Sequence, residues 1–186
     1  MNKFSPLLLA VVLQTGVAQA ATVTIDFEAY ADYTLITTQY SPLGVTFANA
    51  SISQYHCCGT PSQSLVNSSD GGNNRLSPLI ISFASPVFDV SYIYDNYGFS
   101  GGTGFASAFD SSHTLLQTIA SPDNGYGNDL VSFSASGISS IEITNPFDGW
   151  LFAIDDLKFS VPEPGSLALL GLALVGIAGS RKRKAA

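Results

Sequence analysis

Basic residues are scarce in this chain, with 7 lysines and arginines against 14 aspartates and glutamates. Between residues 21 and 161 the imbalance is larger. This part contains two basic residues, Arg75 and Lys158, and 13 acidic residues, which gives a net charge of −11. Such a surface repels nucleic acid and anionic lipid and favours solubility. The scarcity therefore excludes a DNA- or RNA-binding role for this part of the chain.

Cysteine and histidine are also rare. The two cysteines, Cys57 and Cys58, are adjacent and follow His56 in a polar stretch. A structural zinc site needs four ligands, and this stretch does not supply them. In an oxidising compartment the two cysteines could form a strained vicinal disulfide, form disulfides with other molecules, or stay as free thiols. The sequence leaves the choice among these states open.

Long apolar runs are missing as well. The C-terminal run covers residues 167–177, and no charge occurs from residue 165 to residue 180. As a helix, residues 165–179 would reach about 22 Å, less than the roughly 30 Å hydrocarbon core of a bilayer. The four basic residues at 181–184 would keep the C-terminus on the cytoplasmic side. The run predicts a short transmembrane helix that anchors the chain transiently in the inner membrane.

Two prolines and a glutamate, Pro162-Glu163-Pro164, precede this run. Together with the apolar run and the basic terminus, they resemble the PEP-CTERM sorting signal of bacterial exported proteins. The resemblance implies that an exosortase, a membrane peptidase-transpeptidase, cuts near Pro162, Glu163 and Pro164. It also implies a mature protein at the cell envelope or outer surface, often in bacteria that make exopolysaccharide.

The N-terminus has the features of a secretory signal peptide. Lys3 and the free amine supply positive charge, residues 7–13 are apolar, and Ala18-Gln19-Ala20 fits the small-x-small cleavage pattern. We expect signal peptidase to cut after Ala20. The sequence thus predicts three parts: a signal peptide over residues 1–20, a domain over 21–161, and a sorting signal over 162–186.

The domain between these signals is predicted to consist of β-strands. Short stretches alternate apolar and polar residues at a period of two, and no apolar helical period occurs before the C-terminal run. Residues 56–78 are polar with several glycines and prolines, which predicts a long surface loop. This pattern favours an all-β fold, an antiparallel β-sandwich. The predicted strands cover residues 23–28, 44–48, 50–55, 79–83, 87–94, 105–110, 114–119, 130–134, 138–144 and 150–160.

Both ends of the domain carry a second resemblance. Residues 25–28 (Ile-Asp-Phe-Glu) and 153–157 (Ala-Ile-Asp-Asp-Leu), with the hairpin residues 108–110 and 115–116, are similar to MAM-like and carbohydrate-binding-like jelly rolls. In such sandwiches the first and last strands are often neighbours. The resemblance therefore implies a jelly-roll-like domain whose two terminal strands pair.

Pairing of the terminal strands would bring together four acids, Asp26, Glu28, Asp155 and Asp156. Clustered carboxylates repel each other unless a cation or protons neutralise them, and their hard oxygen atoms suit Ca²⁺. Calcium is therefore the candidate cofactor. Because side chains alternate along a strand, only one of Asp155 and Asp156 should point at a given site. The alternative is that all four are solvated acids at strand edges.

Aromatic residues near predicted loops suggest a second site. Tyr97, Tyr126 and Trp150 stand next to glycines in polar stretches. Aromatic rings stack on the apolar faces of sugars while neighbouring polar groups bind the hydroxyls. These three residues are the candidate contacts for a polysaccharide. The alternative is that aromatic rings, including those of Tyr92 and Tyr94, fill the core.

A secreted hydrolase is the alternative function. Ser100 lies in a Gly-Phe-Ser-Gly-Gly stretch that fits the Gly-x-Ser-x-Gly pattern, and His113 and Asp110 would be its partners. That pattern needs a helix after the serine, whereas more glycine and a strand follow here. Glu28 and Glu142 would be a glycosidase pair. We interpret the domain as non-catalytic, with a structural or carbohydrate-binding role.

Overall fold

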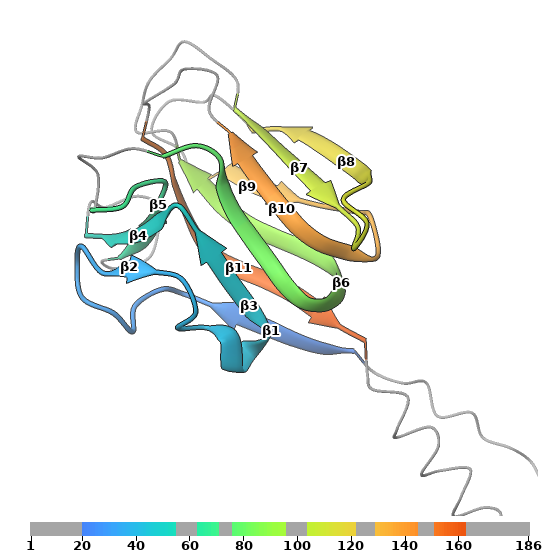
Figure 1. Ribbon diagram of the computed structural model, residues 1–186, viewed down its shortest axis with the longest axis horizontal. Coiled ribbons are helices and arrows are strands. Elements are labelled where there is room, and N and C mark those ends of the chain that lie inside the picture. The colour runs from blue at the N-terminus through green and yellow to red at the C-terminus, as the bar shows by residue number, and fades with distance from the viewer. Residues whose placement is uncertain are drawn as a thin grey trace, which may run out of the picture. The chain divides into compact units, whose positions relative to one another are not determined.

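Antiparallel strands make up most of the part of the chain that the computed structural model describes (Figure 1), which is residues 20–54, 63–70, 76–95, 104–121, 129–144 and 151–162. These residues belong to one compact unit, Ala20–Pro162. All buried apolar residues of the described part lie between Ile25 and Phe159, so this unit carries its own core and can fold by itself. The predicted leader up to Gln19 and the sorting signal from Glu163 onward lie outside the described residues.

Every strand pairs antiparallel with the strands beside it in the sheet, and some of these partners lie far apart in the sequence, as β1 and β11 do. The prediction of an antiparallel all-β domain is therefore confirmed. Within the described ranges no helix is long and apolar enough to cross a membrane. The elements are β1 (Ala21–Ile25), β2 (Leu35–Ile36), the 3₁₀ turn η1 (Ser41–Leu43), β3 (Val45–Ala48), β4 (Ala50–Ser53), β5 (Ser64–Val66), β6 (Leu79–Asp95), β7 (Phe105–Phe109), β8 (Leu115–Ala120), β9 (Asp129–Ser132), β10 (Ile138–Thr144) and β11 (Ala153–Val161).

Strand β6 runs through both layers of the sandwich. Its residues 79–83 pair with β3 and β10, whereas residues 88–95 pair with β11 and β9. The sequence predicts two strands divided at Ser85-Pro86, but the structure contains one bent strand. Pro86 has no N–H to donate. It is tolerated because residues 84–86 are exposed and the pairing with β10 shifts its register beside them.

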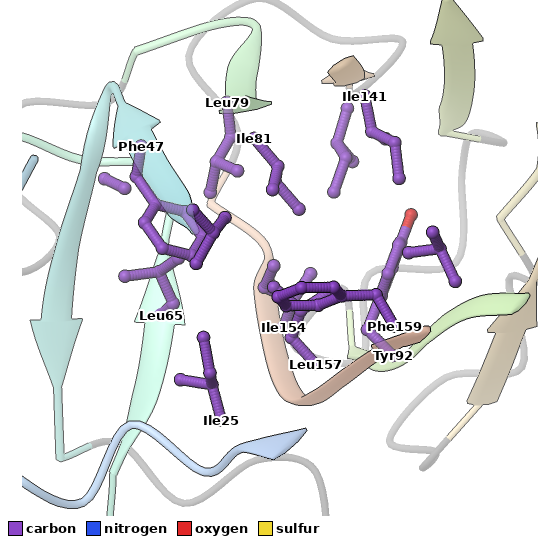
Figure 2. Packing of buried hydrophobic residues seen from close by; sticks show 14 of the residues in the cluster. Ile25, Phe47, Leu65, Leu79, Ile81, Tyr92, Ile141, Ile154, Leu157 and Phe159 are labelled. Atoms are coloured by element: carbon purple, nitrogen blue, oxygen red, sulfur yellow. The ribbon is translucent and has the colours of Figure 1, made fainter. Parts of the chain in front are cut away.

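The two layers enclose one core. One layer has the order β3–β6–β10–β7–β8, and the other has β2–β4–β5–β11–β6–β9, with β1 also paired to β11. The rings of Phe83 on β6 and Phe159 on β11 meet between the layers, with centroids 5.0 Å apart. Each large apolar side chain buried in this way contributes about 1.5–3 kcal/mol. Figure 2 shows side chains of both layers in this core, among them Leu79, Ile81, Ile141, Ile154 and Leu157.

The segment between β4 and β6 differs from the prediction. The sequence predicts a surface loop over residues 56–78, yet β5 within it is buried between β4 and β11. Asn67, directly after β5, accepts the Phe152 N–H through Oδ1 at 2.7 Å and donates from Nδ2 to the Leu76 carbonyl at 3.1 Å. A polar side chain with both ends bonded can be buried. The prediction of a surface loop, which rested on the polar composition, is therefore wrong for β5. The short strand β2 was not predicted either.

Candidate functional site

The first and last strands of the domain are neighbours, as the sequence predicts. β1 pairs antiparallel with β11, and the last rung of this ladder joins Ile25 to Leu157. Asp26 follows Ile25, and Asp156 precedes Leu157. Phe27 has a φ of 57°, in the left-handed region, so β1 ends before it, at Ile25, rather than at residue 28. Acidic residues from both ends of the domain sequence therefore meet at one end of this ladder.

A buried tyrosine, Tyr40, lies close to these acids. Burial raises the pKa of its hydroxyl well above the usual range, and the neighbouring Tyr30 raises it further. Among the described residues this hydroxyl has no hydrogen-bond partner. Three aromatic rings pack edge-on against Tyr40, those of Phe27, Tyr30 and Phe47, with centroids 5.7, 5.5 and 6.0 Å away.

Three carboxylates make the surroundings of this hydroxyl negative. After burial and Tyr30, the charges of Asp26, Asp155 and Glu28 also raise the pKa of Tyr40. These acids come from the start of the domain and from β11, and all act on one buried polar atom. Carboxylate oxygens are the kind of ligand that Ca²⁺ takes in proteins.

The acids themselves differ in environment. Asp155 is fully buried, and its Oδ1 accepts the N–H of Asp156 at 2.7 Å. Asp156 is half-buried with a φ of 50°, where the ladder with β6 shifts its register. Glu28 accepts the Gln63 N–H through Oε1 at 3.0 Å. In the described part of the chain, no three or more acidic, histidine or cysteine side chains form a group that could hold a metal ion.

A second candidate lies on the solvent side of the other layer. We call it the β7 face and define it by Phe105, Ser107, Phe109, Thr118 and Glu142. Ser107 lies opposite Glu142 of β10 on one side and opposite Thr118 of β8 on the other, with 3.1 Å between the Ser107 and Thr118 hydroxyls. In β7 the two alanines point inward and are buried, so both phenylalanines point outward, and Phe105 is 46% exposed. The face combines aromatic carbon with hydroxyl and carboxylate oxygens.

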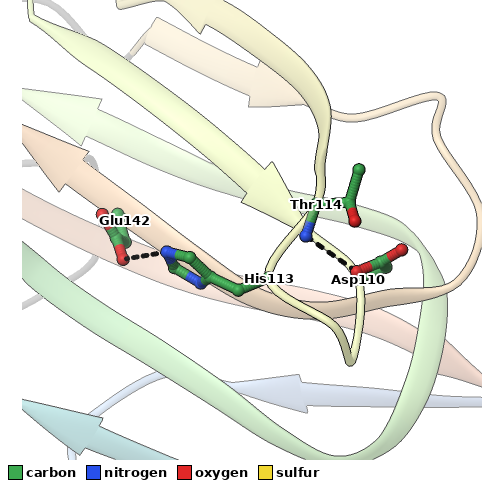
Figure 3. Close-up of polar contacts among 4 residues, drawn as sticks. All are labelled: Asp110, His113, Thr114 and Glu142. Atoms are coloured by element: carbon green, nitrogen blue, oxygen red, sulfur yellow. Dashed lines mark hydrogen bonds and ion pairs between the residues drawn. The ribbon is translucent and has the colours of Figure 1, made fainter.

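His113 borders the β7 face from the hairpin between β7 and β8 (Figure 3). Its imidazole stacks on the ring of Phe109, with centroids 4.3 Å apart and an interplanar angle of 9°. Its Nε2 lies 3.8 Å from Oε1 of Glu142. The stacked rings of Phe109 and His113 and the carboxylate of Glu142 therefore lie together at one end of this face.

Asp110 has a different role in the same hairpin. Its Oδ1 accepts the backbone N–H groups of Thr114 and Ser112, both at 2.8 Å. The bond from Thr114 is the largest cause that lowers the pKa of Asp110. The carboxylate thus closes the turn, while His113 faces Glu142, and Figure 3 shows these as two separate contacts. Ser100, their suggested partner, lies outside the described residues.

The aromatic candidates from the sequence divide into two groups. Tyr97, Tyr126 and Trp150 lie outside the described residues, whereas Tyr92 and Tyr94 are buried in the core. Sequence reasoning missed the outward rings of Phe105 and Phe109, because aromatic residues of a strand normally face the core. The signal that could have found them is the Ala-Ser-Ala sequence between them, since alanines of this strand fit the narrow inner side.

The suggested carboxylate pair is also separated by the fold. Glu142 lies on β10 in the layer that contains β7, with its side chain next to His113. Glu28 follows β1, which pairs with β11 in the other layer. The two glutamates therefore belong to different layers of the sandwich.

The C-terminal segment has a clear match among known protein families. Residues 160–184 match the PEP-CTERM protein-sorting motif, which confirms the resemblance seen in the sequence. This motif marks an exported protein of the cell envelope. A search of curated proteins found no match to the chain.

Several solved structures are similar to the domain in shape. The K2 cleaved adhesin domain of Lys-gingipain is 13% identical with a TM-score of 0.49, covering 76% of this chain and 100% of that chain. The CBM22-1 xylan-binding domain of Paenibacillus barcinonensis Xyn10C is 12% identical with a TM-score of 0.46, covering 80% and 99%. The C-terminal CBM6 of LamC from Zobellia galactanivorans is 15% identical with a TM-score of 0.39, covering 76% and 100%. What these modules bind is a property of those proteins.

Proposed function

We propose that the domain binds a polysaccharide at the cell envelope and has a structural, non-catalytic role there. The β7 face is the observation that carries this proposal. A half-exposed ring at Phe105 and the stacked pair of Phe109 and His113 offer flat apolar surfaces. Hydroxyls and the Glu142 carboxylate stand between them, so a sugar could stack on the rings and bond through its own hydroxyls.

A single substitution tests the face. Phe105→Ala removes the most exposed ring of the face, and we expect it to lower the affinity for a bound glycan about tenfold, the effect of roughly 1.4 kcal/mol. Glycan-array screening followed by affinity electrophoresis on the selected polysaccharide is the measurement. Leu43→Ala on η1 is the matched control, because Leu43 is 45% exposed and its turn leads into β3, which β6 and β10 separate from β7.

Two results would reject the β7 face. One is binding of a glycan by wild-type protein that Phe105→Ala leaves unchanged. The other is equal loss of binding in the Leu43 control. Tyr97, Tyr126 and Trp150 are the other predicted contacts, and alanine substitutions at these positions are the next series if the face is rejected.

We infer that the domain acts without catalysis. In a hydrolase, Asp110 and His113 would serve a nucleophile such as Ser100. Instead the Asp110 carboxylate accepts two backbone N–H groups of its own turn, and His113 pairs with Glu142. These contacts give Asp110 and His113 structural roles within the chain.

We further propose that two enzymes trim the chain. Signal peptidase removes residues 1–20, and an exosortase cuts near Pro162-Glu163-Pro164. Before the second cut, the apolar residues 167–177 hold the chain in the inner membrane, with the basic residues 181–184 on the cytoplasmic side. The match to the sorting motif over residues 160–184 supports processing by an exosortase.

Calcium is the proposed ion near Tyr40, with its carboxylate ligands drawn from Asp26, Glu28, Asp155 and Asp156, which do not form a ready metal-binding group in the described structure. The negative surroundings of the buried Tyr40 hydroxyl support a cation there. A ligand at one hundred times its dissociation constant stabilises a fold by about 2.7 kcal/mol, so we expect Ca²⁺ to raise Tm by about 5–10 °C. Thermal unfolding with EDTA and with added Ca²⁺ measures this shift, and Asp26→Asn should reduce it. An identical Tm in both conditions would remove calcium from the account.

A further inference from the structure

Strand β8 forms an open edge of its layer. It lies at the end of the strand order, next to β7, and no other described strand pairs with it (Figure 1). The Ser121 N–H donates to the Gly104 carbonyl at 2.7 Å. Since bonded pairs alternate in an antiparallel ladder, the backbone groups of Ile119 and Gln117 point toward β7. Those of Thr118 and Ala120 therefore point away, toward the open edge.

This edge lacks most features that normally protect an open strand. Natural edges carry charges, prolines or bulges that prevent pairing with another chain. Residues 114–121 (Thr-Leu-Leu-Gln-Thr-Ile-Ala-Ser) contain no charged residue and no proline, and the ladder with β7 shifts register only near its start. Leu115 is 55% exposed and Leu116 is 39% exposed. Among the described residues, this edge thus offers outward backbone groups without a strand partner, flanked by apolar side chains.

The charge of the domain restricts where two copies can approach each other. With a net charge of −11 over residues 21–161, two copies repel each other through most of their surfaces. The uncharged edge of β8 is a place where they can approach without placing like charges opposite each other. An antiparallel pair of identical strands is also self-complementary, which is what a two-fold dimer requires.

We propose that β8 pairs antiparallel with β8 of a second copy and joins the two sheets edge to edge. A two-fold axis at Thr118 sets Gln117 opposite Ile119 of the second copy, within the part of β8 that keeps a regular ladder with β7. Residues opposite each other share a face, so the two β7 faces then lie on the same side of a continuous sheet. One strand pair buries less than the roughly 1,200–2,000 Å² of a stable interface, so the association is weak and depends on concentration.

Sedimentation velocity of the unit Ala20–Pro162 from low micromolar to near-millimolar concentration tests this dimer, and it needs no polysaccharide. Thr118→Pro removes an outward N–H without touching a bond to β7, and we expect it to weaken association about tenfold or more. Thr118→Val is the matched control: it keeps the N–H and loses the same hydroxyl contact with Ser107, so it should dimerise like wild type.

A second pair of variants keeps the test decisive if Thr118→Pro unfolds the domain. Ala120→Glu adds a charge at the paired edge and should abolish the dimer, whereas Ala120→Ser should preserve it. A wild-type protein that stays monomeric over the whole range would overturn the proposal. A dimer that is unaffected by Ala120→Glu would overturn it equally, because it would use another surface.

Discussion

Asp110 closes the β7–β8 hairpin with its own carboxylate. The side chain accepts two backbone N–H groups, and the main chain adds bonds from Asp110 N–H to the Thr114 carbonyl and from His113 N–H to the Asp110 carbonyl, both at 3.0 Å. His113 has a φ of 59°, which this network of local bonds holds in place. One acidic residue thereby positions the imidazole that stacks on the β7 face.

The lowered pKa of Asp110 predicts a pH dependence. Because the folded value lies below the unfolded value of about 3.9, the charged side chain stabilises the domain above that pH, and this contribution is lost as the pH falls through the folded value. Thermal unfolding of wild type and Asp110→Asn from pH 2.5 to 7 measures it. We expect the two Tm curves to converge at the acidic end. A constant difference across the range would show that the carboxylate charge has no such role.

Strand β5 shows how an element can escape sequence analysis. Its three residues are too short for a periodic pattern, and the polar residues around it suggest a loop. The long alternating strands were predicted nearly at their observed positions, because their signal is local. β5 instead depends on partners far along the chain, since Asn67 bonds to Phe152 and Leu76.

The role of Asn67 in holding β5 can be tested by substitution. Asn67→Ala leaves the Phe152 N–H and the Leu76 carbonyl without their side-chain partner, so the free energy of unfolding should fall by about 1–3 kcal/mol. Chemical denaturation monitored by the fluorescence of the domain measures the change. Ser136→Ala, at an exposed position before β10, is the control and should leave stability within about 0.5 kcal/mol of wild type. Equal stability of both variants would contradict the role given to Asn67.

At the scale of the whole molecule, the charges are divided by position. Acidic residues fill the domain, whereas four of the seven basic residues stand at 181–184. Sorting signals are contiguous, so the sequence alone was enough to identify the C-terminal one, and the motif match confirms it. The β7 face could not be predicted in the same way. Its residues come from three strands, His113 borders it from a turn, and only the register brings Glu142 beside His113 and Ser107.

The most direct test of the whole account is the intact mass of the protein recovered from envelope and medium fractions, with and without the sorting peptidase. The account predicts a product that begins at Ala21 and ends near Pro162-Glu163-Pro164, and one that extends to Ala186 when the peptidase is absent. A cytosolic product that retains both Met1 and Ala186 in cells with the peptidase would contradict it.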